Sequence, residues 1–249
     1  MISRLVRVPL VTLALLASLP GAARAWEVRS TAPAGAFEVF HQRFSTAAYA
    51  YPRHGASPLG VIGWEVYADA TYDRDFDGQP FVPLVIDGDF TGGALSVGRV
   101  GARKGLPGGF DLGLSYGQAL GGDVKLVSAE LQWAWVHGGA LEPAVSLRLS
   151  GTRTLDPQAY SLEQLGAEIL VSKGFAVLTP YLGAGVVRSR GRLERDAGAP
   201  PSLGGDLEET DTQPIVFAGA TLNLLVPKIT VELEKGEAVQ ASVRVGFGF

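Results

Sequence analysis

The residues with the most obvious chemistry form one short acidic motif, DRDFDG at residues 73–78. Its carboxylates are those of Asp73, Asp75 and Asp77. Carboxylates two residues apart before a turn glycine can wrap a calcium ion. The twelfth position of such a loop usually supplies a bidentate glutamate, but here it is Leu84, with Asp87 and Asp89 nearby as substitutes. The motif therefore predicts either a solvated acidic loop or a weak calcium site, and no other cofactor is indicated.

A second group of ionisable residues falls on the polar phase of alternating segments downstream of residue 61. The group consists of Glu65, Asp69, Arg99, Asp111, Glu130, Arg148, Glu168, Glu232 and Arg244. Paired carboxylates can serve acid–base catalysis, but no nucleophile is marked beside them. Acids and bases that face one another in a confined space pair to avoid lone buried charges. We therefore expect a structural charge network rather than an active site.

The remaining chemistry is sparse. The chain has no cysteine, which excludes thiolate catalysis and disulfides. His41 and His54 precede the alternating segments, and His137 lies in a predicted turn, so we expect surface or packing roles rather than metal ligation. The net charge of −4 offers no basic face for nucleic acid. These observations predict a protein that is neither an enzyme nor a nucleic-acid binder.

The elements that must position these residues have a period of two, which is typical of strands. We predict ten strand segments: 61–72, 94–105, 110–120, 123–136, 141–152, 163–172, 176–187, 215–225, 228–234 and 241–249. The alternation is less regular over 94–105, where we expect a bulge or a glycine kink. The fold class is therefore all-β.

Segment length and loop length favour a membrane over a soluble sheet. Most segments exceed the about 5–6 residues common in soluble proteins and reach the about 9–11 needed by a tilted membrane strand. Short and long connections alternate, with the long ones at 73–93, 152–161 and 188–214. We predict a closed antiparallel transmembrane β-barrel of about ten strands, with eight or twelve as alternatives, short periplasmic turns and longer extracellular loops.

Aromatic residues mark the ends of several segments, as expected for membrane-interface girdles. They are Trp64, Tyr72, Trp133, Trp135, Phe247 and Phe249. The last strand, ASVRVGFGF, resembles the C-terminal assembly signal of bacterial outer-membrane β-barrels through Val243, Val245, Phe247 and Phe249. The resemblance implies an outer-membrane location and recognition by the barrel-insertion machinery. The rim histidine of omptin-like barrel proteases has no counterpart here.

The chain begins with features of an export signal. Residues 1–25 contain a charged start, an apolar run from Val8 to Leu19 and an A-x-A cleavage site, so we expect a cleaved signal peptide. Residues 26–60 do not alternate, although Phe37, Phe40 and Phe44 suggest a short ordered piece. We predict an N-terminal periplasmic segment or a plug, with two more strands as a further alternative, followed by the barrel at 61–249.

The predicted function is an integral outer-membrane barrel with a structural role or passive small-solute permeation, its lumen largely filled by paired charges. Its partners would be outer-membrane lipid and lipopolysaccharide, whose anionic headgroups the arginines of loop 188–214 could hold. These arginines are Arg188, Arg190, Arg192 and Arg195. Two alternatives are loop-mediated adhesion or ligand recognition, and a secreted soluble β-sandwich or lipocalin-like binding protein.

Overall fold

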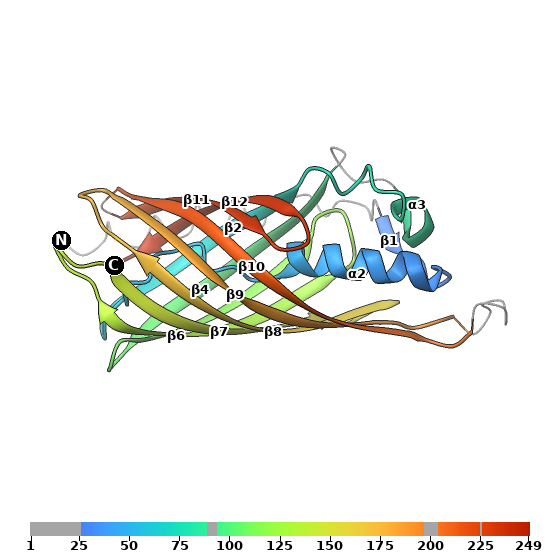
Figure 1. Cartoon of the computed structure of the whole chain (residues 1–249), viewed down its shortest axis with the longest axis horizontal. Coiled ribbons are helices and arrows are strands. Elements are labelled where there is room, and N and C mark those ends of the chain that lie inside the picture. Colours follow the sequence, from blue (N-terminus) through green and yellow to red (C-terminus); the bar gives the residue numbers. More distant parts are fainter. Residues whose placement is uncertain (1–25, 89–93, 197–203, 225) are drawn as a thin grey trace, which may run out of the picture.

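A computed structural model describes residues 26–88, 94–196, 204–224 and 226–249. Within these residues ten antiparallel strands close into a barrel (Figure 1). In chain order they are β2 (Trp64–Asp73), β4 (Leu95–Leu106), β5 (Phe110–Ala119), β6 (Lys125–His137), β7 (Ala144–Leu155), β8 (Tyr160–Ser172), β9 (Leu178–Leu193), β10 (Leu207–Asn223), β11 (Pro227–Lys235) and β12 (Val239–Gly248). The prediction of a closed antiparallel barrel of about ten strands is confirmed.

The last strand closes the barrel against the first. β12 pairs with β2 from Ala241 opposite Tyr72 to Gly248 opposite Glu65. Beyond this ladder, Trp64 and Phe249 exchange two backbone hydrogen bonds of 2.9 and 3.1 Å. Over the length where all ten strands pair, closure leaves no strand edge, so each backbone group there can be satisfied by a neighbouring strand.

Two details of the strand prediction were wrong. Of the two alternatives predicted for 94–105, a bulge or a glycine kink, the bulge is wrong, because β4 pairs in continuous register with both β2 and β5. The glycine at position 101 leaves space for the side chain of Tyr67, since a Cβ at Gly101 would overlap the Tyr67 ring. The register shift lies in β6, between Ala134 and Val136. Moreover, β9 and β10 continue through Leu193 and from Leu207, so part of the expected loop 188–214 is strand.

The two ends of the barrel differ, and we name them by their connections. The turn end carries short links such as 107–109 and 138–143 together with Phe249, and the loop end carries the links 74–94 and 194–206. In Figure 1 the C-terminus marks the turn end, and the paired extensions of β9 and β10 project at the other end. The first long link contains α3 (Val82–Val85) and β3 (Ile86–Gly88), which pairs with β1 (Trp26–Val28) in a separate two-stranded sheet.

From α2 (Ala34–Ala48) onward, the N-terminal segment lies inside the barrel (Figure 1). Helix α2 follows β1 and occupies the half of the barrel nearer the loop end (Figure 1). It contacts strands on separate parts of the wall, including β2, β4 and β10. Phe37, Phe40 and Phe44 are fully buried, which follows from their i, i+3, i+7 spacing on one helix face. The segment adds no strand to the barrel wall, whereas the predicted signal peptide, 1–25, lies outside the described residues.

After α2 the chain continues along the lumen without regular secondary structure, towards the turn end (Figure 1). The side chains of Tyr49, Tyr51 and Arg53 are each 1 % exposed. The backbone nitrogen of Ala56 bonds to Ser172 Oγ at 2.9 Å, and that of Leu59 bonds to Asp111 Oδ1 at 3.0 Å. Residues 34–59 therefore form a plug, and we use that name for them below. Among the described residues, no helix is both long and apolar enough to cross a bilayer.

Candidate functional site

The outer surface of the barrel wall is apolar. Large side chains on the outward phase of the strands are more than a third exposed, among them Val66, Leu112, Leu114, Leu131, Leu149, Leu165, Ile169, Leu182, Val186, Val231, Leu233 and Val243. A folded protein surrounded by water rarely displays a continuous apolar face of this kind. The apolar residues of the wall strands therefore face outward, and the polar residues face inward.

The predicted interface aromatics lie on this outward phase. Trp64, Tyr72, Trp133, Trp135 and Phe249 are between 39 and 66 % exposed, and Phe247 is half-buried. At the turn end Trp64 packs edge-on against Phe249, with ring centroids 5.5 Å apart. Trp133 stacks on Phe110 at 6.0 Å. Most of this aromatic surface gathers at the turn end, while Tyr72 lies near the other end of β2.

All nine charged residues predicted for the lumen lie inside the barrel. Their exposed fractions range from 0 % for Arg148 to 8 % for Glu130. Ion pairs join eight of them into two groups, one around Arg148 and one around Asp69. Glu232 lies apart from the ion pairs, and its carboxylate accepts a hydrogen bond of 2.5 Å from the Tyr181 hydroxyl.

The first group is organised by two guanidinium groups. Arg148 pairs with Glu130 at 2.5 Å and with Glu168 at 3.0 Å. Its Nη2 also donates to the plug carbonyl of Ala50 at 2.5 Å. Arg103 pairs with Glu130 at 2.9 Å, with Asp111 at 3.1 Å and with Glu65 at 3.5 Å. Glu130 thus links strands β4, β6 and β7 across the interior.

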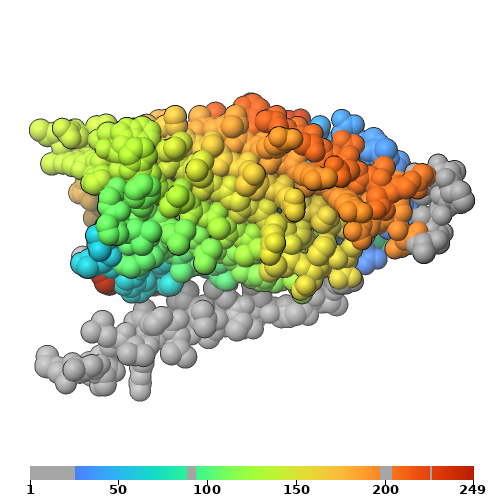
Figure 2. Space-filling view, turned by 90° about the horizontal axis from the view of Figure 1, so that it is seen from below, coloured from blue at the N-terminus to red at the C-terminus, as the bar shows by residue number. Residues whose placement is uncertain are grey.

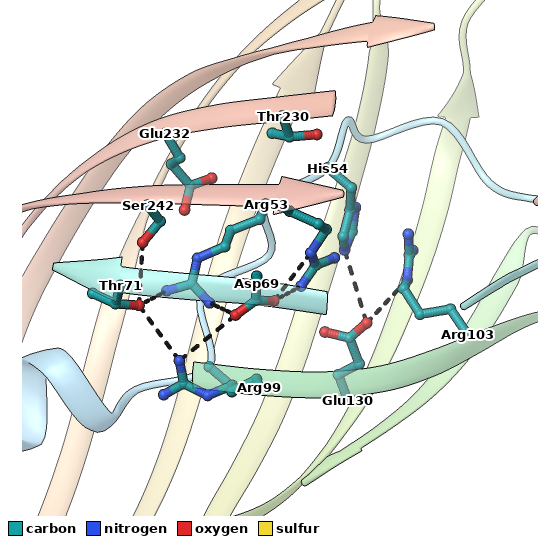
Figure 3. A network of polar contacts seen from close by, with 12 residues as sticks. Arg53, His54, Asp69, Thr71, Arg99, Arg103, Glu130, Thr230, Glu232 and Ser242 are labelled. Carbon is teal, nitrogen blue, oxygen red and sulfur yellow. Dashed lines mark hydrogen bonds and ion pairs between the residues drawn. The ribbon is translucent and has the colours of Figure 1, made fainter. Parts of the chain in front are cut away.

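The second group surrounds Asp69 (Figure 3). Its carboxylate pairs with Arg244 at 2.9 Å, with Arg53 at 3.0 Å and with Arg99 at 3.9 Å. Arg53 belongs to the plug and also pairs with Glu234 at 3.0 Å. A plug arginine therefore joins β2 to β11 through the middle of the barrel.

Arg99 has a second role at the end of the plug helix. Its Nη2 donates to the carbonyl oxygens of Ala48 at 2.6 Å and Tyr49 at 3.1 Å. The last carbonyls of a helix have no partner within the helix, and a cation there also complements the helix dipole. The wall of the barrel thus caps α2 from outside the helix.

Sequence reasoning missed four members of the network: Arg53, Arg103, Glu234 and Tyr49. Arg103 and Glu234 continue the inward phase of Arg99 and Glu232, so the alternation alone could have identified them. Arg53 and Tyr49 lie in the segment without periodicity. The Tyr49 hydroxyl bonds to Ser150 at 2.6 Å and to Glu168. The wall position facing that hydroxyl is Gly166, where a Cβ would overlap it.

The network leaves little free space. The cavity bordered by Arg53, Tyr67, Arg148 and Arg244 holds about 10 Å³. A single water needs roughly that much. At this level the barrel interior is therefore filled by side chains rather than open to solutes.

Towards the loop end the interior becomes apolar. The aromatic face of α2 packs against wall residues of several strands, namely Leu95, Val97, Leu126, Tyr160, Leu162 and Leu193. The Phe40 ring lies 5.2 Å from Tyr160 and 5.3 Å from Phe44. This half of the interior is a conventional hydrophobic core formed between a helix and the inside of the barrel.

His41 is the polar exception in that core. Its Nδ1 lies 2.9 Å from the Tyr160 hydroxyl, and its Nε2 lies 3.1 Å from Ser189 Oγ. Burial lowers the pKa of the imidazole to about 4, so the ring is neutral near pH 7. His41 and Ser189 are 0 and 1 % exposed, so this pair is closed to any substrate and serves packing. His54 lies 3.8 Å from Glu130, whereas His137 is exposed at the turn end.

The predicted calcium ligands do not converge. The Asp73 carboxylate is buried and accepts hydrogen bonds from Nε and Nη2 of Arg43, at 3.0 and 2.9 Å. Asp75 and Asp77 are exposed, Asp87 pairs with Arg29 at 3.0 Å, and Asp89 lies outside the described residues. Across the described parts of the chain, no group of three or more histidine, cysteine or acidic residues is placed to hold a metal.

The arginines predicted for the loop 188–214 lie mostly on strand β9. Arg190 pairs with Glu208 at 2.7 Å, and Arg192 pairs with Asp206 at 2.8 Å, both at the surface. Arg195 donates to the carbonyls of Ser30 and Ala32 at 2.7 and 2.8 Å. It therefore fastens the start of the N-terminal segment to the end of β9.

Comparisons with known proteins give fold-level likeness only. No protein-family model and no curated protein matches the chain. Among solved structures, the N-terminal β-barrel domain of Pseudomonas aeruginosa OprF is 14% identical with a TM-score of 0.35, covering 76% of this chain and 99% of that one. Neisserial surface protein A is 13% identical with a TM-score of 0.33, covering 74% and 95%. The KdgM porin is 9% identical with a TM-score of 0.39, covering 74% and 99%.

Proposed function

We propose that this protein is an integral barrel of a bacterial outer membrane, with its outward face against acyl chains. The apolar outer wall supports this, together with exposed aromatics at the turn end and strands mostly of 10 residues or more. A closed ladder is one of the two structures that satisfy the backbone in hydrocarbon. The alternative of a lipocalin-like binder fits less well, because such a protein keeps an apolar cavity inside, and here the interior holds ion pairs and a plug.

Within that membrane the proposed role is structural rather than conducting. The observation that carries this proposal is the filled interior, in which Arg148 and Arg53 tie the plug to the wall on several sides. A pore needs a continuous aqueous path, and the cavity at the charge network has room for about one water. The proposal includes no catalytic step.

Planar-bilayer recording of the full mature chain tests this role. The intact protein should give no defined conductance steps, whereas a variant lacking residues 34–59 should give steps if it inserts. Heat-modifiable gel migration should show that both proteins are folded barrels. Defined conductance steps from the intact protein would refute the structural role and indicate passive permeation instead.

The location has its own test. The mature chain should require detergent for extraction and should aggregate when the amphiphile is removed. We also propose that Val243, Val245, Phe247 and Phe249 are read by the insertion machinery. Replacing Phe249 by Ser should slow membrane assembly in cells more than it slows refolding in detergent. A mature chain that is folded and monomeric in plain buffer would refute the membrane proposal.

A second candidate is recognition of a polar ligand at the loop end. A cavity of about 550 Å³ opens there between the N-terminal segment and the links of the barrel. Its lining includes Arg29, Asp87, Asp123, Glu194 and Arg195. Ligand binding to whole cells, measured before and after deletion of the link 194–206, distinguishes the two roles. The deletion should reduce binding if the loop end recognises a ligand, and should leave binding unchanged if the barrel is structural.

A further inference from the structure

The outward face of β5 to β9 carries a groove that the closed interior does not explain. One part has a volume of about 460 Å³ and continues into a second part of about 530 Å³. Both parts share Ala129, Gly151, Leu165 and Arg188. Figure 2 shows the molecule from below relative to Figure 1, the side on which β6, β7 and β8 lie.

The groove exists because small residues sit between large ones on the outward phase. Leu165, Gly151 and Ala129 are register neighbours across β8, β7 and β6. Leu114 follows on β5, opposite Ala129. Leu165 and Leu114 are 72 and 59 % exposed, so they form ridges on either side. A Cβ at Gly151 would make only ordinary contact, 3.5 Å from Leu165 Cδ2, which leaves the floor open to a larger side chain.

Cations border the groove on the side nearer the loop end. Arg153, Glu163 and Arg190 are register neighbours across β7, β8 and β9. Arg188 lies in the next row, opposite Leu165. Arg190 already pairs with Glu208 at 2.7 Å. Arg153 and Arg188 form no ion pair with any described residue, and Glu163 is the acidic residue among them.

We propose that this groove binds one phosphate-bearing lipid of the outer leaflet, of the diphosphorylated glycolipid type found in lipid A. The proposal rests on the membrane location proposed above. Arg153 and Arg188 contact the phosphates, and acyl chains lie along Ala129 and Gly151. Anionic headgroups attract an arginine that lies near the membrane surface, and guanidinium groups bind phosphate through paired donors. The two connected parts of the groove suit a lipid with several chains better than one with a single chain.

Native mass spectrometry of the full mature protein in detergent tests the site, with purified lipid A as the probe and phosphatidylcholine as the neutral comparison. The intact protein should retain one lipid A at concentrations at least tenfold below those for phosphatidylcholine. The double change Arg153→Gln with Arg188→Gln should abolish that difference. Gly151→Leu, which fills the floor without altering charge, should weaken retention by a similar factor. Glu163→Gln should strengthen it severalfold.

Lys235→Gln is the matched control, because it removes an exposed cation from β11, outside the groove. It should leave retention unchanged. Equal loss in this control, or intact retention in both the double variant and Gly151→Leu, would overturn the site. Retention of phosphatidylcholine equal to that of lipid A would overturn it too. Heat-modifiable migration separates the two proposals, since a variant that migrates as a folded barrel but fails to discriminate lipids disproves the site alone.

Discussion

The two halves of the barrel interior are filled by different means. Near the loop end, the phenylalanines of α2 pack against apolar wall residues and make a core with one buried histidine. Nearer the turn end, the non-helical part of the plug is held by guanidinium and carboxylate groups. The first half gains stability from burial itself. The second gains little net energy from its charges, but each depends on its partners, because an unpaired buried charge is costly. Substitutions should therefore act differently in the two halves.

The largest effect is expected at Arg148 in the polar half. Arg148→Met leaves Glu130 and Glu168 without their shared cation and should lower the free energy of unfolding by about 3–5 kcal/mol. Guanidinium-induced unfolding in detergent measures this change. Adding Glu130→Gln and Glu168→Gln to the same chain should restore most of the loss. If the triple variant is as unstable as the single one, packing rather than charge explains the effect.

The apolar half should respond to loss of volume. Phe40→Ala removes a fully buried ring between Phe44 and Tyr160 and should lower the free energy of unfolding by about 3 kcal/mol. Hydrogen exchange should rise at the amides of α2 and stay slow around Arg53. Val39→Ala is the control on the same helix, because Val39 is 45 % exposed. Equal effects at the two positions would mean that the helix is not packed as described.

Acid should loosen the apolar half through His41. The pKa of its imidazole is about 4 inside the barrel, against the ordinary 6.5 when the plug is released. The folded state disfavours the proton, so its stability is full above about pH 6.5 and falls as the pH drops towards 4. Between about pH 7 and about pH 5 the loss should be about 2 kcal/mol.

Protease sensitivity of the plug as a function of pH provides the measurement. The difference between the native chain and His41→Gln isolates the histidine from the carboxylates of the network, because both proteins contain those carboxylates. If the two chains respond to pH identically, His41 does not control the plug.

The smallest effect is expected outside the barrel interior. Arg192→Gln breaks an ion pair with Asp206 in which both side chains are largely exposed. Solvent and side-chain entropy offset such pairs, so the unfolding midpoint should not change measurably. A shift as large as that of Arg148→Met would contradict the distinction between buried and exposed pairs.

The strands could be predicted from the sequence because the side of the wall that each residue faces depends only on its position along its own strand. Each residue of β12, from Val239 to Gly248, faces in or out according to its parity, so alternation locates both the strand and its lumen charges. Arg148 and Glu168 were predicted for this reason, although their pairing across β7 and β8 was not. Arg103 and Glu234 obeyed the same rule and were overlooked.

The plug was decided by tertiary structure. The spacing of Phe37, Phe40 and Phe44 indicates order, but a helix with one apolar face can pack against many surfaces. Only the closed barrel shows that inward glycines, such as Gly166 beside Tyr49, leave space for a second element. Likewise, Arg53 pairs with Asp69 and Glu234 because the lumen brings together residues distant in the chain. The sequence by itself determined the barrel wall, because inward and outward residues alternate along each strand. The plug inside the barrel depends on contacts between residues that follow no periodic pattern in the sequence.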